Sequence, residues 1–327
     1  MTNPMDAFPS EPLATGEGPP VILFGHGRSG TSIIAALMRQ HLGIAFGTES
    51  QFILRFLSSL DNYGDLSDDD NLRSLIRSIL AERWFKRSRK FGDFKVTEEQ
   101  VFQAIEERSY SGLLRTIFSI FAKHLKMDRW GDKTPGYIHD MASIHNLFPE
   151  AQFVYVVRDG RDVALSLKHI HFGPKNMFSA AHDWREVMRA GDDFAASLSD
   201  KQLFYIRYED FLDEPVEVFM NLASFLDVDA EPGTLRTSLT EEMLPNIKLG
   251  NSNKWVNQYS SSQRKVYDSI AFSELEKHGY ETSVAEAGKE SGWLTHTYWK
   301  ALSELGKWRF TDYWQDNFHK VRTRLRR

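Results

Sequence analysis

The stretch "GHGRSGTS" (Gly25–Ser32) decides the fold, because it joins two segments of different character. The apolar run "VILF" (Val21–Phe24) precedes it and predicts a buried strand. The amphipathic run "SIIAALMRQHLG" (Ser32–Gly43) follows it and predicts a helix that ends at its last glycine. A turn between such elements presents free backbone N–H groups and the positive end of the helix dipole, and its three glycines let a phosphate approach closely. We therefore expect a phosphate-binding loop.

The loop departs from the P-loop consensus G-x-x-x-x-G-K-[ST] at one position. Thr31 stands where the consensus has lysine, and the only cation within the loop is Arg28. In nucleotide triphosphatases that lysine neutralises the phosphates, and a separate acid holds Mg²⁺; here the run "VYVVRD" offers Arg158 before any acid. The sequence therefore favours a ligand with one phosphate at this loop, bound without a metal ion. The alternative is a glycine turn that binds no ligand.

A second motif, "VVRDGRDVALS" (Val156–Ser166), offers groups for another phosphate. Arg158 stands at the end of an expected strand, and Ser166 lies eight residues later in the following helix. Both can face the crevice at the carboxyl edge of the sheet, where open α/β folds bind ligands. A guanidinium and a hydroxyl suit a phosphate. The alternative is a surface salt bridge from Arg158 to Asp159 or Asp162.

Three apolar runs, each followed by a polar turn and a helical pattern, define the fold class. They are Val21–Phe24, Gln152–Val157 and Leu203–Tyr208. Such runs, alternating with amphipathic helices, predict a three-layer α/β fold of the P-loop type, with a central parallel sheet flanked by helices. "GDFKV" (92–96) and "DRWG" (128–131) are further strand candidates, and residues 65–127 predict a helical insertion.

Composition excludes several classes of function. The chain has 327 residues, of which 41% are apolar and 26% charged, and a net charge of −5. A nucleic-acid binder usually carries a basic excess, so that class is disfavoured. The absence of cysteine removes disulfides, thiol nucleophiles and cysteine-bound zinc, and no H-E-x-x-H motif is present. We expect no metal site.

The two ends of the chain differ from the segment between them. Residues 1–20 carry prolines, glycines and acids, which predict a disordered leader. They lack the basic and apolar regions of a signal peptide. No apolar run approaches the ~18 residues that cross a bilayer, so a cytoplasmic location is expected. Residues 283–327 predict an aromatic and basic helical extension, after a domain over 21–282. We expect its helix to dock on this domain or on a second subunit; a membrane-surface contact is the alternative.

The glycine loop and the Arg158–Ser166 motif, in this order, resemble the paired signatures of sulfotransferases that use 3′-phosphoadenosine 5′-phosphosulfate (PAPS). "WGDKTP" (Trp130–Pro135), "RYEDFLDEP" (Arg207–Pro215), "NSNKWVNQYS" (Asn251–Ser260) and "LEKHGY" (Leu275–Tyr280) extend the likeness to bacterial and tyrosylprotein-type enzymes. The likeness covers roughly residues 20–282. It implies PAPS as the sulfuryl donor, with the 5′-phosphosulfate on the loop and the 3′-phosphate on the Arg–Ser pair.

The resemblance also implies which residues bind PAPS. They are Gly27, Arg28, Ser29, Gly30, Thr31, Ser32, Arg158, Ser166, Tyr208, Ser252, Asn253, Lys254 and Trp255. The family pattern has a serine directly before the lysine, where this chain has Asn253, so Ser252 is the candidate for the serine's role.

Sulfuryl transfer requires neutralisation of the departing phosphate and a base for the acceptor hydroxyl. By resemblance to the tyrosylprotein-type enzymes, Arg28 and Lys133 supply the positive charge. Glu49, which stands 21 residues after Arg28, is the implied general base. The cytosolic sulfotransferases use a histidine instead, which leaves His139 or His145 as the alternative base.

The acceptor is not determined by the sequence. Small-molecule, glycan, lipid and peptide hydroxyls all suit the family, and we expect residues 65–127 and 172–190 to shape the acceptor pocket. Two other classes of function stay open: a small-molecule kinase with an unusual P-loop, and a degenerate P-loop protein that binds nucleotide or scaffolds partners without catalysis.

Overall fold

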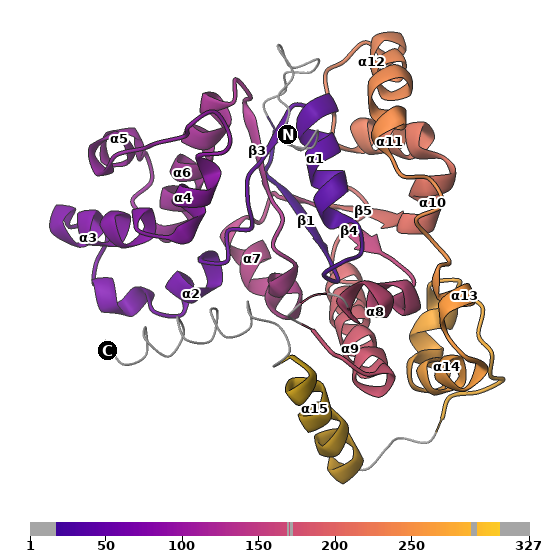
Figure 1. The fold of residues 1–327 in the computed structure, drawn as a ribbon. Coiled ribbons are helices and arrows are strands. Elements are labelled where there is room, and N and C mark those ends of the chain that lie inside the picture. The colour runs from indigo at the N-terminus through magenta and orange to yellow at the C-terminus, as the bar shows by residue number, and fades with distance from the viewer. Residues whose placement is uncertain (1–17, 169, 171–172, 289–292, 308–327) are drawn as a thin grey trace.

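A parallel five-stranded sheet forms the centre of the molecule. The computed structural model describes residues 18–168, 170, 173–288 and 293–307. The strand order is β2-β3-β1-β4-β5, and every pair of neighbours is parallel. The strands are β1 (Val21–Gly25), β2 (Ile44–Phe46), β3 (Arg129–Asp132), β4 (Gln152–Val157) and β5 (Leu203–Arg207). Helices flank the sheet (Figure 1), which confirms the predicted fold class.

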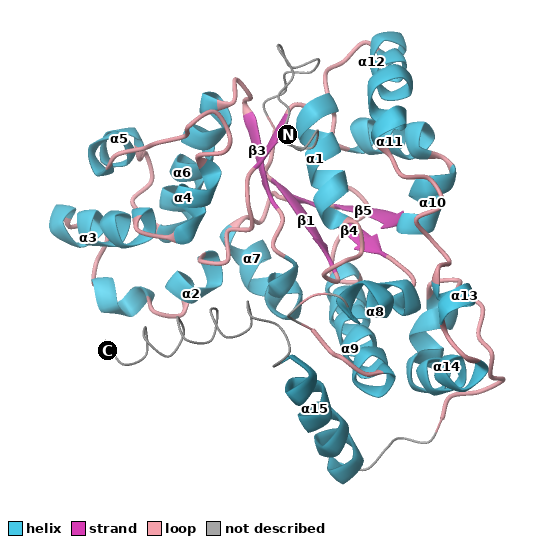
Figure 2. Ribbon diagram, viewed as in Figure 1, coloured by secondary structure: helices cyan, strands magenta, loops and turns pink. Residues whose placement is uncertain are grey.

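Helices occupy most of the remaining described chain (Figure 2). The α-helices are α1 (Thr31–His41), α2 (Ile53–Leu57), α3 (Asp69–Leu80), α4 (Arg83–Ser88), α5 (Glu98–Ala104), α6 (Tyr110–His124), α7 (Met141–Leu147), α8 (Gly160–Lys168), α9 (Met177–Ala195), α10 (Tyr208–Asp213), α11 (Pro215–Phe225), α12 (Pro232–Ser238), α13 (Trp255–Gln258), α14 (Ser261–Lys277) and α15 (Trp293–Lys307). Shorter 3₁₀ or π turns are η2 (Leu60–Tyr63), η3 (Pro135–Asp140), η4 (Leu239–Met243) and η5 (Leu244–Asn246).

Strands β1 to β4 bury both of their faces, whereas the edge strand β5 leaves Tyr205 44% exposed. Alternate side chains of a strand point to opposite sides, so Ile22 and Phe24 join the larger core with helices α2 to α9 and α14. Val21 and Leu23 join a second core with α1 and α10 to α12. Burial on both sides explains why β1 and β4 are continuous apolar runs without alternation.

Four of the five strands in the sheet were predicted from the sequence. "DRWG" forms β3, whereas "GDFKV" forms no strand: Gly92 and Asp93 have φ angles of 68° and 55°, which turn the chain, and Phe94 packs in the core. The third predicted strand ends at Arg207, because the next residue begins α10. Strand β2 was not predicted, since its three residues are too short to form a pattern.

Helices α3 to α6 form the helical insertion between β2 and β3, and they gather beyond the β3 side of the sheet (Figure 1). Helix α15 lies against the start of α9. There Asn176 Nδ2 donates to the Trp299 carbonyl at 2.9 Å, and the Lys175 N–H donates to Ser303 Oγ at 2.8 Å. The predicted extension beyond residue 307, like most of the predicted leader, lies outside the described residues. No described helix is both long and apolar enough to cross a membrane.

Candidate active site

The glycine loop lies at the carboxyl end of β1, at the start of α1. Arg28 has a φ of 76° and Gly30 a φ of 94°, so two of its residues adopt left-handed backbone. A Cβ at Gly30 would lie 2.3 Å from Cε2 of Tyr208, which explains why glycine is required there. The Ser29 N–H donates to the His26 carbonyl at 3.1 Å and closes the turn. The loop is therefore compact and held against the Tyr208 ring.

A cavity of about 600 Å³ opens beside the loop, and we call it the nucleotide cavity. Its lining carries four cations and one carboxylate. The lining residues are Arg28, Gly30, Thr31, Ser32, Ile33, Arg158, Asp162, Leu165, Ser166, Tyr208, Asn246, Lys248, Asn251, Lys254 and Gln258. This excess of positive charge, together with the start of α1, suits a ligand with more than one phosphate.

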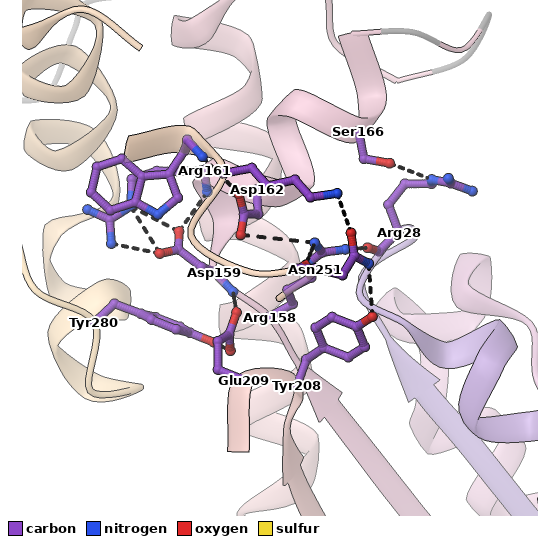
Figure 3. Close-up of polar contacts among 12 residues, drawn as sticks. Arg28, Arg158, Asp159, Arg161, Asp162, Ser166, Tyr208, Glu209, Asn251 and Tyr280 are labelled. Atoms are coloured by element: carbon purple, nitrogen blue, oxygen red, sulfur yellow. Dashed lines mark hydrogen bonds and ion pairs between the residues drawn. The ribbon is translucent and has the colours of Figure 1, made fainter. Parts of the chain in front are cut away.

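Arg158 lies deep in this cavity, only 6% exposed. Its Nη1 donates to the Arg28 carbonyl at 3.1 Å, and its Nη2 donates to the Asn251 carbonyl at 2.7 Å (Figure 3). The guanidinium carbon lies 4.6 Å from the centre of the Tyr208 ring. Its Nε is buried and has no hydrogen-bond partner among the described residues. A buried donor without a partner is costly, so the side chain is prepared for an additional acceptor.

The salt-bridge alternative for Arg158 has little support. Asp162 Oδ2 is 4.0 Å from Arg158 Nη2, which is too long for a hydrogen bond. Asp159 pairs with Arg161 at 2.8 Å instead. Burial also raises the pKa of Asp162, because it disfavours the charged carboxylate that a salt bridge with Arg158 needs.

The two predicted phosphate motifs meet inside the nucleotide cavity. Arg28 Nε donates to Ser166 Oγ at 2.9 Å, so a residue of the loop contacts a residue of α8 (Figure 3). The sequence placed these residues 138 positions apart. The structure therefore brings the loop, Arg158 and Ser166 together around one volume.

A second cavity, of about 350 Å³, adjoins the first, and we call it the acceptor cavity. It shares three lining residues with the nucleotide cavity, Arg28, Thr31 and Ser32. Glu49 also lines it. Lys133 Nζ lies 2.7 Å from Glu49 Oε1 and donates to Ser32 Oγ at 3.1 Å. The three predicted catalytic residues thus surround the junction of the two cavities.

Strand pairing explains the contact between Glu49 and Lys133. Each follows the carboxyl end of a strand, and β2 pairs with β3 in parallel register. The Ser50 N–H donates to Thr134 Oγ1 at 3.0 Å and ties the two following turns together. Asp132, beside Lys133, is 4% exposed, and burial raises its pKa to about 6.

The structure separates the histidine candidates for the base. His139 lines the acceptor cavity. His145 packs edge-on against the rings of Phe153 and Phe194, and it lines neither cavity. A third histidine, His26, was not predicted; its Nδ1 is 2.6 Å from the Gly27 carbonyl and its Nε2 is 3.0 Å from Asp183 Oδ2.

Both partners of His26 only accept hydrogen bonds. Both ring nitrogens of His26 are thus engaged by groups of the protein itself. This geometry favours Glu49 over His26 as the base.

The other predicted PAPS-binding residues differ in whether they line a cavity. Lys254 lines the nucleotide cavity, whereas Ser252, Asn253 and Trp255 do not. Ser29 is fully buried behind the loop, and Gly27 lines the acceptor cavity.

One of the two segments that we expected to shape an acceptor pocket lines the second cavity. Gly173, Asp183 and Val187 come from the predicted interval 172–190, but no described residue of 65–127 lines the acceptor cavity. Helices α3 to α6 pack instead on the core beyond β3. Four further residues line the nucleotide cavity without having been predicted. Asn251 and Gln258 belong to the quoted segment Asn251–Ser260 but were not singled out in it, and Asn246 and Lys248 carry no motif of their own.

Comparison with solved structures places this architecture in the class of sulfotransferase folds. The sulfotransferase domain of an olefin synthase from Synechococcus PCC 7002 has a TM-score of 0.50 and 18% sequence identity, and the match covers 83% of this chain and 98% of that domain. The model of the sulfotransferase family matches residues 19–232. The chain belongs to the sulfotransferase family, as its motifs predicted.

Curated relatives agree with this assignment at low identity. A protein-tyrosine sulfotransferase of Drosophila melanogaster is 22% identical over 302 residues, which cover 85% of this chain and 55% of the relative. Protein-tyrosine sulfotransferase A of Caenorhabditis elegans is 24% identical over 216 residues, 64% of this chain and 50% of the relative. The chain thus spans about half the length of the curated relatives it matches.

Proposed function

We propose that the protein transfers a sulfuryl group from PAPS, as a co-substrate, to the hydroxyl of an acceptor. One observation carries the proposal: Lys133 contacts both Ser32 of the glycine loop and Glu49, where the nucleotide and acceptor cavities meet. Sulfuryl transfer needs positive charge on the donor side and a base on the acceptor side. Membership of the sulfotransferase family supports this reading over the kinase and the non-catalytic alternatives.

The donors of the nucleotide cavity fit PAPS. Loop backbone and the hydroxyls of Thr31 and Ser32 suit the 5′-phosphosulfate, because they stand at the start of α1. Arg158, with its unpartnered Nε, and Ser166 suit the 3′-phosphate. Tyr208 offers an aromatic face at the same cavity. No residue in this set requires a metal ion, and we propose that none takes part.

The chain's own residues then have distinct tasks. A bond forms between the acceptor oxygen and sulfur, the bond from sulfur to the bridging phosphate oxygen breaks, and the hydroxyl proton passes to Glu49. Arg28 and Lys133 offset the negative charge that grows on the phosphate side. Lys133 also holds Glu49 at 2.7 Å, which orients the carboxylate beside the loop.

We propose that the acceptor hydroxyl enters the acceptor cavity. Apolar side chains of Ile138, Leu167 and Val187 line it, together with the polar groups of His26, Glu49 and Asp183. This mixture suits a mainly apolar molecule that carries its hydroxyl toward Glu49. Small-molecule, lipid, glycan and peptide hydroxyls remain the classes to screen. We further propose that the protein acts in the cytoplasm and that its C-terminal extension serves self-association or membrane contact.

A labelled-sulfate transfer screen tests the function. Purified protein is incubated with ³⁵S-labelled PAPS and panels from these acceptor classes, and labelled product is separated from PAPS. We expect transfer to at least one panel, with loss of transfer in Glu49→Gln and retention in the matched surface control Glu106→Gln. Equal transfer by wild type and Glu49→Gln would remove Glu49 from the mechanism. ATP-dependent phosphorylation of the same panels would replace the proposal by the kinase alternative.

A further inference from the structure

A buried ion cluster lies behind the nucleotide cavity and has no role in the chemistry proposed above. Its centre is Arg161, in the first turn of α8 and 2% exposed. Nε and Nη2 of Arg161 donate to the two carboxylate oxygens of Asp159 at 2.9 and 2.8 Å. Nη1 donates to the Glu281 carbonyl at 2.8 Å and to Asp268 Oδ1 at 3.3 Å. A buried guanidinium needs this full set of partners, so Arg161 is rigidly held.

The cluster joins three motifs that are far apart in the sequence. The Asp159 N–H donates to Glu209 Oε1 at 3.1 Å, and the Tyr280 hydroxyl donates to Glu209 Oε2 at 2.8 Å (Figure 3). Glu209 belongs to the "RYEDFLDEP" segment and Tyr280 to "LEKHGY". These motif residues therefore contact one another and not the cavity, which none of them lines.

Trp255 closes the cluster from outside. Its ring centre lies 3.7 Å from the guanidinium carbon of Arg161, a stacking distance, and its backbone N–H donates to Asp162 Oδ1 at 3.1 Å. Trp255 is half-buried and does not line the nucleotide cavity. Its ring is thus engaged by Arg161 on the side of α8.

The four residues before Trp255, Asn251–Lys254, form the closing segment. At its first residue, the Asn251 carbonyl accepts from Arg158, and Asn251 Nδ2 donates to the Tyr208 hydroxyl at 3.1 Å (Figure 3). At its third residue, Asn253 adopts a φ of 54°, a left-handed conformation that asparagine tolerates better than serine. That backbone need accounts for asparagine at the position where the family pattern has serine.

We propose that Arg161 and Trp255 form a latch that holds the closing segment over the nucleotide cavity, so that Trp255 governs nucleotide affinity through Arg161 and not by touching the nucleotide. The segment is then anchored on both sides, by Arg158 at Asn251 and by Arg161 and Asp162 at Trp255. Arg158 lies two residues before α8 and Arg161 in its first turn, so the latch fixes the segment relative to the proposed 3′-phosphate group. Arg161 and Trp255 are positioning residues.

The rival explanation is direct contact of Trp255 with the nucleotide. Its indole Nε1 is buried without a partner among the described residues, so a bond to a ligand is chemically open. The two explanations differ in how the losses combine. A latch is one interaction, and removal of either partner breaks it, so the second substitution costs no further affinity. If Trp255 contacts the nucleotide and Arg161 only stabilises the cluster, the two substitutions act independently and their fold-changes in affinity multiply.

A double-mutant cycle on binding of the product, 3′-phosphoadenosine 5′-phosphate (PAP), distinguishes them. The variants are Trp255→Leu, Arg161→Met and the double variant, measured by titration calorimetry. From the strength of a partly desolvated cation–π contact we expect about a 5- to 30-fold weakening for Trp255→Leu. The double variant should bind PAP about as tightly as the more weakly binding of the two single variants. Trp255→Phe, which keeps an aromatic face, should restore most of the affinity, and the neighbouring Val256→Ala should match wild type.

Arg161→Met leaves two buried carboxylates unpaired and can fail to fold. In that case Arg161→Lys replaces it in the cycle, because lysine keeps the charge but lacks the planar face that stacks on the indole. The dissociation rate of PAP gives a second readout: an opened latch raises it in Trp255→Leu, while the melting temperature of the ligand-free variant stays within a few degrees of wild type.

The proposal rests on the proposed function, and the outcomes separate the two. Two results overturn the latch while PAP binding by wild type stands. One is a loss of PAP affinity in the double variant equal to the product of the two single losses, and the other is a Trp255→Phe variant that binds PAP as weakly as Trp255→Leu. Wild-type protein that binds no PAP overturns the proposed function and the latch with it.

Discussion

Replacement of Arg158 by methionine tests the assignment of the second phosphate motif. Arg158 is 6% exposed, its two Nη atoms hold the Arg28 and Asn251 carbonyls, and its Nε has no partner among the described residues. A 3′-phosphate would give the Nε a charged acceptor in a desolvated position. A charge-assisted hydrogen bond contributes roughly 1.5–3 kcal/mol, which corresponds to about 10- to 150-fold in affinity.

The same replacement also frees two carbonyls and loosens the closing segment, and that loss affects every nucleotide. The informative quantity is therefore a ratio of affinities. Titration calorimetry of PAP and of adenosine 5′-monophosphate, which lacks the 3′-phosphate, gives this ratio for each variant. We expect Arg158→Met to lower the preference for PAP about 10- to 150-fold. Arg236→Met, which breaks a surface ion pair with Glu217, should keep the wild-type ratio. An unchanged ratio in Arg158→Met would refute the assignment.

Three further predictions concern catalysis and stability. Glu49→Gln should lower kcat for sulfuryl transfer about 10²- to 10⁴-fold while PAP affinity stays near wild type; a parallel loss of both would assign Glu49 to the fold of the loop and not to proton transfer. Gly30→Ala should lower the free energy of unfolding by about 1–3 kcal/mol, because its Cβ would meet Tyr208 at a backbone φ of 94°; urea denaturation at wild-type stability would contradict this. Burial raises the pKa of Asp132 from 3.8 to about 6, so the native state holds this proton more tightly than the unfolded chain. Stability should then fall as pH rises from about 4 to 7, by at most about 3 kcal/mol, and Asp132→Asn should lack this decrease; urea unfolding curves of equal pH dependence for both proteins would rule it out.

The residues of the two predicted phosphate motifs could be found in the sequence, because each motif is a local pattern. Three glycines between an expected strand and an expected helix mark the glycine loop. Arg158 and Ser166 follow the next clear strand at a recognisable spacing. The structure brings both motifs into one cavity, where Arg28 contacts Ser166 directly. Such local order is visible in sequence because a strand and the turn after it are contiguous.

Contacts between distant segments were less accessible. Strand β2 is only three residues long, yet it determines where Glu49 lies relative to Lys133. Asn246, at the end of the short turn η5, and Lys248, in the chain just after it, reach the nucleotide cavity, and no periodic pattern marks such residues. His26 belongs to the glycine loop, but its contact could not be predicted, because its partner Asp183 comes from α9, 157 residues away. Trp255 was expected at the nucleotide, and only its stacking on Arg161 indicates another role.

Calorimetric titration of the purified protein with PAP in EDTA, and separately with ATP and Mg²⁺, tests the central claim most directly. A loop without the P-loop lysine, beside a cavity with separate donors for a second phosphate, predicts metal-independent binding of PAP at one site and binding of ATP with Mg²⁺ that is weaker by at least about tenfold. Binding of ATP with Mg²⁺ as tight as that of PAP, or a requirement of PAP for metal, would contradict it.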